Sequence, residues 1–165
     1  MSLLLGVLGL SLGSFLNVLA ARYDPDQFLV NRDTVGGRSR CPRCGAALRW
    51  YELVPIVSYL LQRGRCRSCS GKISFVYPAA ELLSALVFIA VPLRLEAFYP
   101  LPVAHLLSSI LWIAAFELLL LLSLVDLRLR IVPDEINLSL GALGVLAALF
   151  MASYPALGTS SFLGP

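Results

Sequence analysis

Residues 3–21 read LLLGVLGLSLGSFLNVLAA, a run of 19 residues without a charged side chain. As an α-helix this run would be about 28 Å long, close to the ~30 Å hydrocarbon core of a bilayer. Only Met1 and Ser2 precede it, so it lacks the basic segment that opens a secretory signal peptide. We therefore expect a retained first membrane span whose N-terminus lies outside the cell.

Three further apolar runs follow, at residues 79–93, 104–125 and 136–152. The first of these is short for a span, and the second is interrupted only by His105 and Glu117. Hydrophobic residues make up 58% of the chain and charged residues 14%, against about 25% charged in soluble domains. Buried helices of a soluble protein are the alternative, but four near-continuous apolar runs favour membrane spans. The sequence predicts an all-α polytopic membrane protein with about four transmembrane helices.

Most of the positive charge lies between the first two runs. Residues 22–72 contain ten of the 13 basic residues and four acidic ones, a net charge of +6. Because basic loops stay in the cytoplasm, this loop and the turn 126–135 are predicted to be cytosolic and the hairpin 94–103 external. Nucleic-acid binding is the alternative, but no stacking face of aromatic residues accompanies the charge. We expect the lipid bilayer, and no nucleic acid, as a partner.

All four cysteines lie in this basic loop, as Cys41-Pro-Arg-Cys44-Gly and Cys66-Arg-Ser-Cys69-Ser-Gly. Two close thiolates in each of two turns can complete a tetrahedral metal site. Two disulfides are the alternative, but the cytosol is reducing, and no βαβ pattern supports a thioredoxin-like motif. The spacing therefore predicts a four-cysteine zinc site. Since it leaves no ligand position open for water, we expect a structural zinc that supplies folding energy to the loop.

Glycine is expected to play a special role in each cysteine turn. Gly45 and Gly71 follow their pairs, where a chain that turns back beneath a metal often needs a positive φ angle.

Small and polar residues in the apolar runs indicate helix contacts. Gly9 and Gly13 are spaced to let a second helix approach closely, and Asn17 continues the same stripe. Glu117 is expected to form an interhelical hydrogen bond.

Two aspartates flank the turn between the last two runs. Asp126 ends the third run, where it is either a functional carboxylate or an interfacial charge paired with Arg130. Asp134 follows Pro133 and is predicted to be the N-cap of the fourth helix.

These features divide the chain into four parts. They are a first transmembrane helix (1–21), a cytosolic zinc-binding loop (22–76), transmembrane helices two to four (77–152), and the start of a further, truncated segment (153–165).

Four motifs in this order resemble type IV prepilin leader peptidases. They are Gly13-Ser-Phe-Leu-Asn-Val18, the paired Cys-x-x-Cys turns, Tyr77-Pro-Ala-Ala-Glu-Leu-Leu83, and the segment from Asp126 to Pro133-Asp134. Each motif is modest alone, but together they cover residues 13 to about 140 on one predicted topology.

The resemblance implies a bacterial inner-membrane aspartyl peptidase that removes the basic leader of prepilins or pseudopilins on the cytosolic side. It serves type IV pilus or type II secretion systems, and many members then methylate the new N-terminus with S-adenosylmethionine. Asp126 would be the first catalytic aspartate and Asp134 a supporting residue, with Cys41, Cys44, Cys66 and Cys69 as zinc ligands.

One departure concerns the second catalytic aspartate, which the family carries in a later Gly-x-Gly-Asp motif. This sequence has no such motif and no aspartate after Asp134. We therefore expect the 165-residue chain to be incomplete as an enzyme. The alternative is a non-proteolytic, zinc-bearing membrane assembly or binding protein that uses the same scaffold.

Overall fold

The computed structural model describes residues 2–99 and 101–153, so most of the predicted segment 153–165 lies outside the described residues. The elements, in chain order, are α1 (Ser2–Arg22), α2 (Arg32–Val35), the 3₁₀ helix η1 (Trp50–Glu52), α3 (Val57–Leu61), α4 (Val76–Leu95), α5 (Pro102–Leu129) and α6 (Asp134–Ser153). In this part of the chain the only β-type pairing consists of two isolated antiparallel bridges, Arg40 with Ala47 and Arg65 with Lys72. The predicted all-α class is confirmed.

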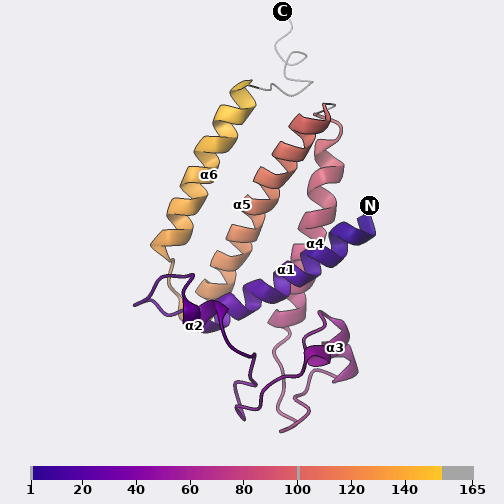
Figure 1. Cartoon of the computed structure of the whole chain (residues 1–165), viewed down its shortest axis with the longest axis vertical. Helices are drawn as coiled ribbons and strands as arrows, with labels where there is room; N and C mark the ends of the chain where they lie inside the picture. The colour runs from indigo at the N-terminus through magenta and orange to yellow at the C-terminus, as the bar shows by residue number, and fades with distance from the viewer. Residues whose placement is uncertain (1, 100, 154–165) are drawn as a thin grey trace, which may run out of the picture.

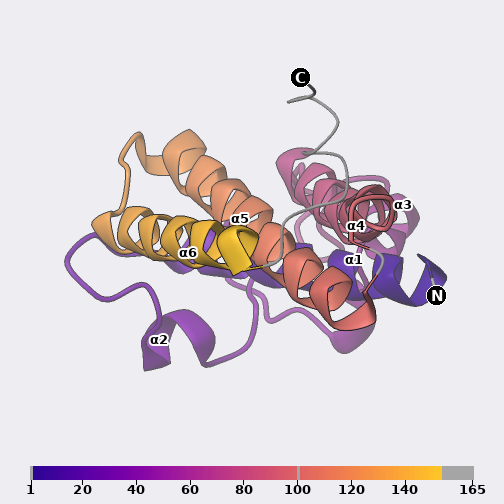
Figure 2. The same cartoon turned by 90° about the horizontal axis from the view of Figure 1, so that it is seen from above.

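Four helices are long and apolar enough to cross a membrane: α1, α4, α5 and α6. The second apolar run, which is short for a span in the sequence, lies within a helix of 20 residues. In Figure 1, α4, α5 and α6 run side by side, while α1 crosses α4 and α5 obliquely, which is also visible from above in Figure 2. Only 6% of the apolar window of α6 is buried among the described residues.

The contact between α1 and α4 rests on the predicted small residues. A Cβ atom added to Gly9 would lie 2.6 Å from the Ala85 Cα, and one added to Gly13 would lie 2.8 Å from the Glu81 Cα. The Ser84 hydroxyl donates a hydrogen bond to the Gly9 carbonyl at 2.7 Å. The Asn17 amide donates to the Tyr77 carbonyl at 3.0 Å, so both the packing face and the interhelical role of Asn17 are confirmed.

Glu117 of α5 is buried, as expected for a carboxyl inside a helix bundle. Neither of its oxygens has a hydrogen-bond partner among the described residues, although Ser84 of α4 lies beside it. The predicted interhelical hydrogen bond is therefore not formed within this part of the chain.

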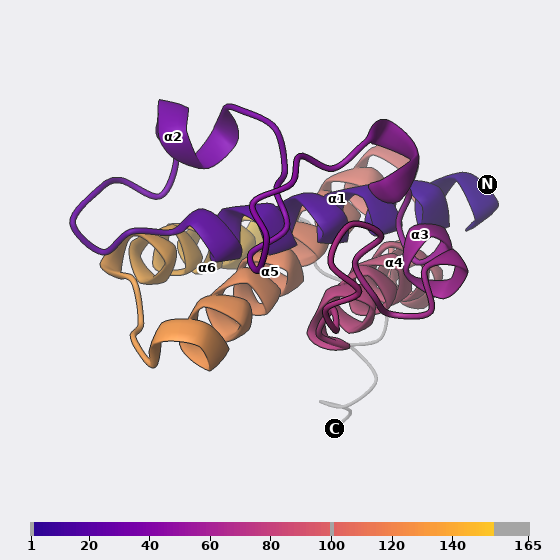
Figure 3. The same ribbon diagram turned by 90° about the horizontal axis from the view of Figure 1, so that it is seen from below.

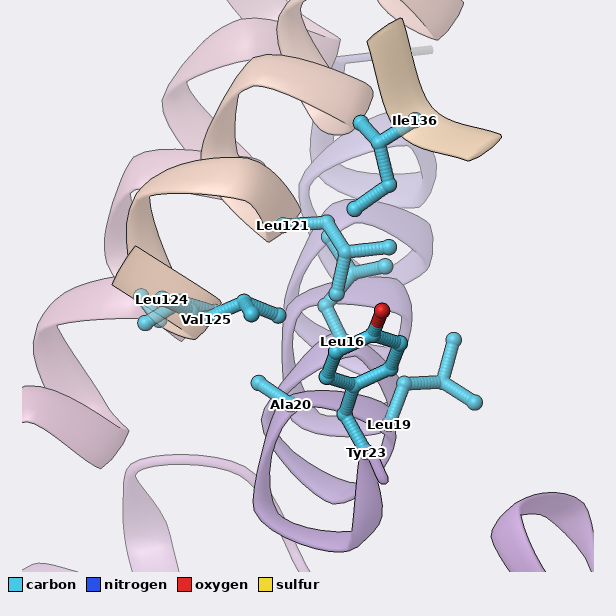
Figure 4. Packing of buried hydrophobic residues seen from close by; sticks show 9 residues of the cluster. Leu16, Leu19, Ala20, Tyr23, Leu121, Leu124, Val125 and Ile136 are labelled. Atoms are coloured by element: carbon cyan, nitrogen blue, oxygen red, sulfur yellow. The ribbon is translucent and has the colours of Figure 1, made fainter. Parts of the chain in front are cut away.

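A buried apolar cluster joins α1 to α4, α5 and α6 near the turn between the last two helices. Its members are Leu16, Leu19, Ala20, Tyr23, Ala80, Leu121, Leu124, Val125 and Ile136, and Figure 4 shows how they pack. The Arg128 guanidinium donates to the Ala20 carbonyl at 2.7 Å and ties the end of α5 to the end of α1. The first loop therefore begins beside the turn that connects α5 to α6.

Candidate functional site

The four cysteine sulfurs form one cluster, with every pair of Sγ atoms within 4.8 Å. Zn–S bonds of ~2.3 Å in a tetrahedron would place the sulfurs about 3.8 Å apart. The Cys41 and Cys69 sulfurs are 4.0 Å apart, and all four thiols are free of disulfides. The loop thus brings together four thiols that could hold one metal ion, two of them buried and two exposed.

The two cysteine pairs sit in two backbone turns of the same kind. The Cys41 N–H donates to the Ala46 carbonyl, and the Gly45 N–H donates back to the Cys41 carbonyl, both at 2.9 Å. In the second turn the Cys66 N–H donates to the Gly71 carbonyl and the Ser70 N–H to the Cys66 carbonyl, both at 2.8 Å. The two turns are therefore closely equivalent, and each presents its sulfurs toward the other.

The expectation about the two glycines holds for only one of them. Gly45 has a φ of 71°, as predicted, but Ser70 and not Gly71 takes the equivalent position, with a φ of 54°. Gly71 is needed for space, since a Cβ atom there would lie 2.7 Å from the Arg43 Cδ and 3.2 Å from the Cys69 Sγ. The extra residue between Cys69 and Gly71 shifts the glycine by one place in the turn.

The Cys41 thiol is adapted to ionise. The backbone N–H groups of Cys44 and Arg43 point at its sulfur and lower its pKa to about 7, against the opposing effect of burial. A sulfur that is readily deprotonated is a better metal ligand, because the thiolate is the binding form.

A buried carboxylate attaches the loop to α4. The Ile56 N–H donates to the Glu81 Oε2 at 2.7 Å, and Ile56 has a φ of 61°, a conformation that a β-branched residue rarely adopts. No sequence pattern indicated this role, because the bond joins residues 25 positions apart.

A cavity of about 740 Å³ lies between the loop, α1 and the first turns of α4. Its helix side includes Asn17 and Glu81, and its loop side reaches Cys41 and Cys66. The cationic side chains on its wall are Arg22, Arg38, Arg40, Arg43 and Lys72.

Asp126 and Asp134 lie apart from this cavity, at the turn between α5 and α6. Asp126 is exposed in the last turn of α5 and forms no ion pair with a described side chain, so the alternative pairing with Arg130 is not observed. Asp134 is exposed and is the first residue of α6. The Asn137 N–H donates to the Pro133 carbonyl at 3.2 Å, which places Pro133 at the N-cap and corrects the prediction for Asp134 by one residue.

Comparison with known proteins decides the family. Residues 7–95 match the model of the bacterial peptidase A24 N-terminal domain. The chain belongs to this family. No solved structure matches it.

Several curated proteins that are similar to this chain share one name. This chain is 44% identical over 156 residues to the prepilin leader peptidase/N-methyltransferase of Myxococcus xanthus (strain DK1622). The match covers 94% of this chain and 41% of the relative. The chain is 34% identical to the proteins of the same name from Bacillus subtilis (strain 168), covering 81% of this chain and 48% of the relative, and from Vibrio cholerae serotype O1, covering 96% and 60%. The chain spans about half the length of the curated relatives it matches.

The family model covers both cysteine pairs and Glu81 of the A24 domain, and it ends before Asp126. The Myxococcus match covers 94% of this chain and therefore extends well beyond the residues of the family model.

The first loop also contacts the turn that carries these aspartates. The Leu29 N–H donates to the Glu135 Oε2 at 2.8 Å. Burial raises the pKa of Tyr23, and the nearby carboxylates of Glu135, Asp134 and Asp24 raise it further. Neither Tyr23 nor Glu135 carried a sequence signal for this arrangement, because the contact joins residues 106 positions apart.

Proposed function

We propose that this protein is part of a membrane aspartyl peptidase that removes the basic leader of type IV prepilins or pseudopilins. The observation that carries the proposal is the match over 94% of the chain to a relative named prepilin leader peptidase/N-methyltransferase. The four membrane-length helices and the exposed carboxylate at the end of α5 support it.

Asp126 is the proposed water-activating carboxylate. One carboxylate cannot both hold a proton for the scissile carbonyl and deprotonate water, so the reaction requires a second. Asp134 is given a supporting role, because it lies in the first turn of α6, where its charge favours the helix dipole. No aspartate follows Asp134, so we propose that the second catalytic carboxylate is not supplied by these 165 residues.

The four cysteines are the proposed ligands of a structural zinc ion. Their sulfurs are close enough for one tetrahedral site, and four thiolates leave no position open for a reacting water. Zinc would therefore stabilise the loop and take no part in peptide hydrolysis.

The relatives' name also supports methylation of the new N-terminus, for which S-adenosylmethionine is the proposed methyl donor. No residue is assigned to its binding. The proposed location is the bacterial inner membrane, with the cysteine cluster and Asp126 on the cytosolic side, where the basic residues of the loop favour retention.

The test is leader cleavage of a prepilin, in membranes, by an enzyme that contains this chain together with the proposed second carboxylate. Asp126→Asn should abolish cleavage, because it preserves the shape of the side chain and removes its ability to exchange a proton. Asp134→Asn is the matched control and should retain substantial activity, since its proposed role is not in proton transfer. Zinc content and membrane insertion should be unchanged in both variants. Full activity of Asp126→Asn would defeat the assignment.

A further inference from the structure

The segment 50–61 of the basic loop, WYELVPIVSYLL, exposes six large apolar side chains, here called the apolar stripe. They are Trp50 in η1, Leu53 and Val54 between the two helices, and Val57, Leu60 and Leu61 in α3, and all are exposed. Trp50 and Leu61 are each 79% exposed. Contiguous apolar surface of this kind marks a contact with a protein or a membrane.

The opposite side of the segment is already occupied. Ser58 and Tyr59 line the cavity that the loop forms with α1 and α4, and Leu53 also reaches it. Within α3, Ser58 and Tyr59 thus face this cavity, whereas Val57, Leu60 and Leu61 of the exposed apolar stripe lie outside its lining.

Two contacts hold the segment against the end of a membrane-length helix. The Ile56 N–H donates to Glu81, and the Tyr59 and Phe75 rings meet edge to face with centroids 6.4 Å apart. Glu81 lies five residues into α4, about 7.5 Å from its first residue along the axis. Seen from below, α3 lies beside the start of α4 (Figure 3). The segment is therefore held at the depth where α4 enters the membrane.

The charged residues that flank the segment indicate which kind of surface it contacts. Arg49 precedes the segment, and Arg63 and Arg65 follow it, all three exposed. A tryptophan beside apolar side chains and flanked by arginines is suited to the boundary between lipid headgroups and acyl chains, and arginines favour anionic headgroups.

We propose that residues 50–61 are an interfacial anchor that inserts its apolar stripe into the headgroup region of an anionic phospholipid bilayer. The anchor fixes the cysteine cluster close to the membrane surface, over the cavity. It does not depend on peptidase activity, so the two proposals fail independently.

The test uses Trp50 as a fluorescent probe. The sequence has two tryptophans, so Trp112→Phe leaves Trp50 alone. The protein is reconstituted into bilayers of phosphatidylcholine and phosphatidylglycerol, with or without bromine on the acyl carbons nearest the headgroup. We expect the bromine to quench Trp50 and the bilayer to protect it from aqueous acrylamide, with less quenching when phosphatidylglycerol is left out.

A double variant, Leu60→Ser with Leu61→Ser, should lose bromine quenching of Trp50 while retaining its metal content. Phe28→Ser is the matched control: Phe28 is an equally exposed apolar side chain of the same loop outside the segment, and its loss should leave quenching unchanged. Free access of acrylamide to Trp50 in bilayers would overturn the proposal. Protection from acrylamide without bromine quenching would also overturn it, because protein and not lipid would then cover the stripe.

Discussion

Gly9 and Gly13 set how closely α1 and α4 approach each other. The atoms that a Cβ on Gly9 would meet are all backbone atoms of α4, at 2.6 to 2.9 Å, and a backbone cannot rotate out of the way as a side chain can. In lipid, where helices gain little from excluding water, close packing of this kind is a main source of association energy. These glycines therefore stabilise the pair of helices that frames the cavity.

Gly9→Ala should destabilise the protein by about 1–3 kcal/mol, because the added methyl group pushes α1 away from α4. Gly144→Ala is the control, since a Cβ there meets nothing within 4 Å, and it should leave stability unchanged or raise it by up to ~1 kcal/mol through helix propensity. Denaturation of both variants in detergent micelles measures the difference. Equal stability would show that the glycines do not set the helix separation.

Gly45 and Ser70 hold the left-handed backbone position in their respective cysteine turns, and substitutions of the two can be compared. Gly45→Ala should weaken metal binding by about 1 kcal/mol, because φ is 71° there and an L side chain is strained in that region. Ser70→Gly should bind as tightly as the original protein or more tightly, because the strain at a φ of 54° is removed. Competition with a chromophoric chelator measures both affinities. Weaker binding by Ser70→Gly than by Gly45→Ala would contradict the equivalence of the two turns.

At the scale of elements, the cysteine cluster could be predicted and its attachment could not. The spacing of Cys41, Cys44, Cys66 and Cys69 is a local pattern, and the geometry of a metal site follows from such patterns. The bond from Ile56 to Glu81 and the one from Leu29 to Glu135 join distant residues through tertiary packing, which no local pattern records. The N-cap of α6 was misplaced by one residue for a local reason, since an aspartate after a proline fits either the N-cap or the first helical position.

Removing the metal should unfold the turns and leave the long helices intact. Between residues 41 and 72 the chain has few buried apolar side chains apart from the cysteines, so metal binding would supply the energy that orders it. A strong chelator should make the arginines of this loop sensitive to trypsin, while the helical circular dichroism signal changes little. Zinc should restore resistance and magnesium should not. Resistance that survives complete removal of the metal would show that the loop folds without it.

At the scale of the whole molecule, hydropathy predicted which segments are long enough to span a membrane but not how they cross. A charge-free run shows that a helix is long enough to span the membrane, whereas the tilt of that helix is set by packing against its neighbours. The oblique path of α1 across α4 and α5 (Figure 1) depends on Gly9, Gly13 and Asn17, whose partners lie some 60 to 75 residues away in sequence.

The sidedness of the molecule follows partly from geometry and partly from charge. Arg128 bonds to Ala20 and Leu29 bonds to Glu135, so the first loop and the turn between α5 and α6 must lie on the same side of the membrane. The hairpin between α4 and α5 lies at the other end of these helices (Figure 1). Which of the two sides is cytosolic depends on the excess of arginine in the first loop.

Cysteine labelling in spheroplasts decides this last point. In a background whose four native cysteines are replaced by serine, Glu96→Cys in the hairpin should react with a membrane-impermeant maleimide. Arg38→Cys and Arg130→Cys should react only after the membrane is disrupted, because both would face the cytosol. If Arg38→Cys and Arg130→Cys are labelled in intact spheroplasts while Glu96→Cys is not, the molecule is inverted and the assignment of Asp126 to the cytosolic side is wrong. If Arg38→Cys is labelled in intact spheroplasts and Arg130→Cys is not, or the reverse, the two residues lie on opposite sides of the membrane. The contact between the first loop and the turn would then be wrong, because it requires both on the same side.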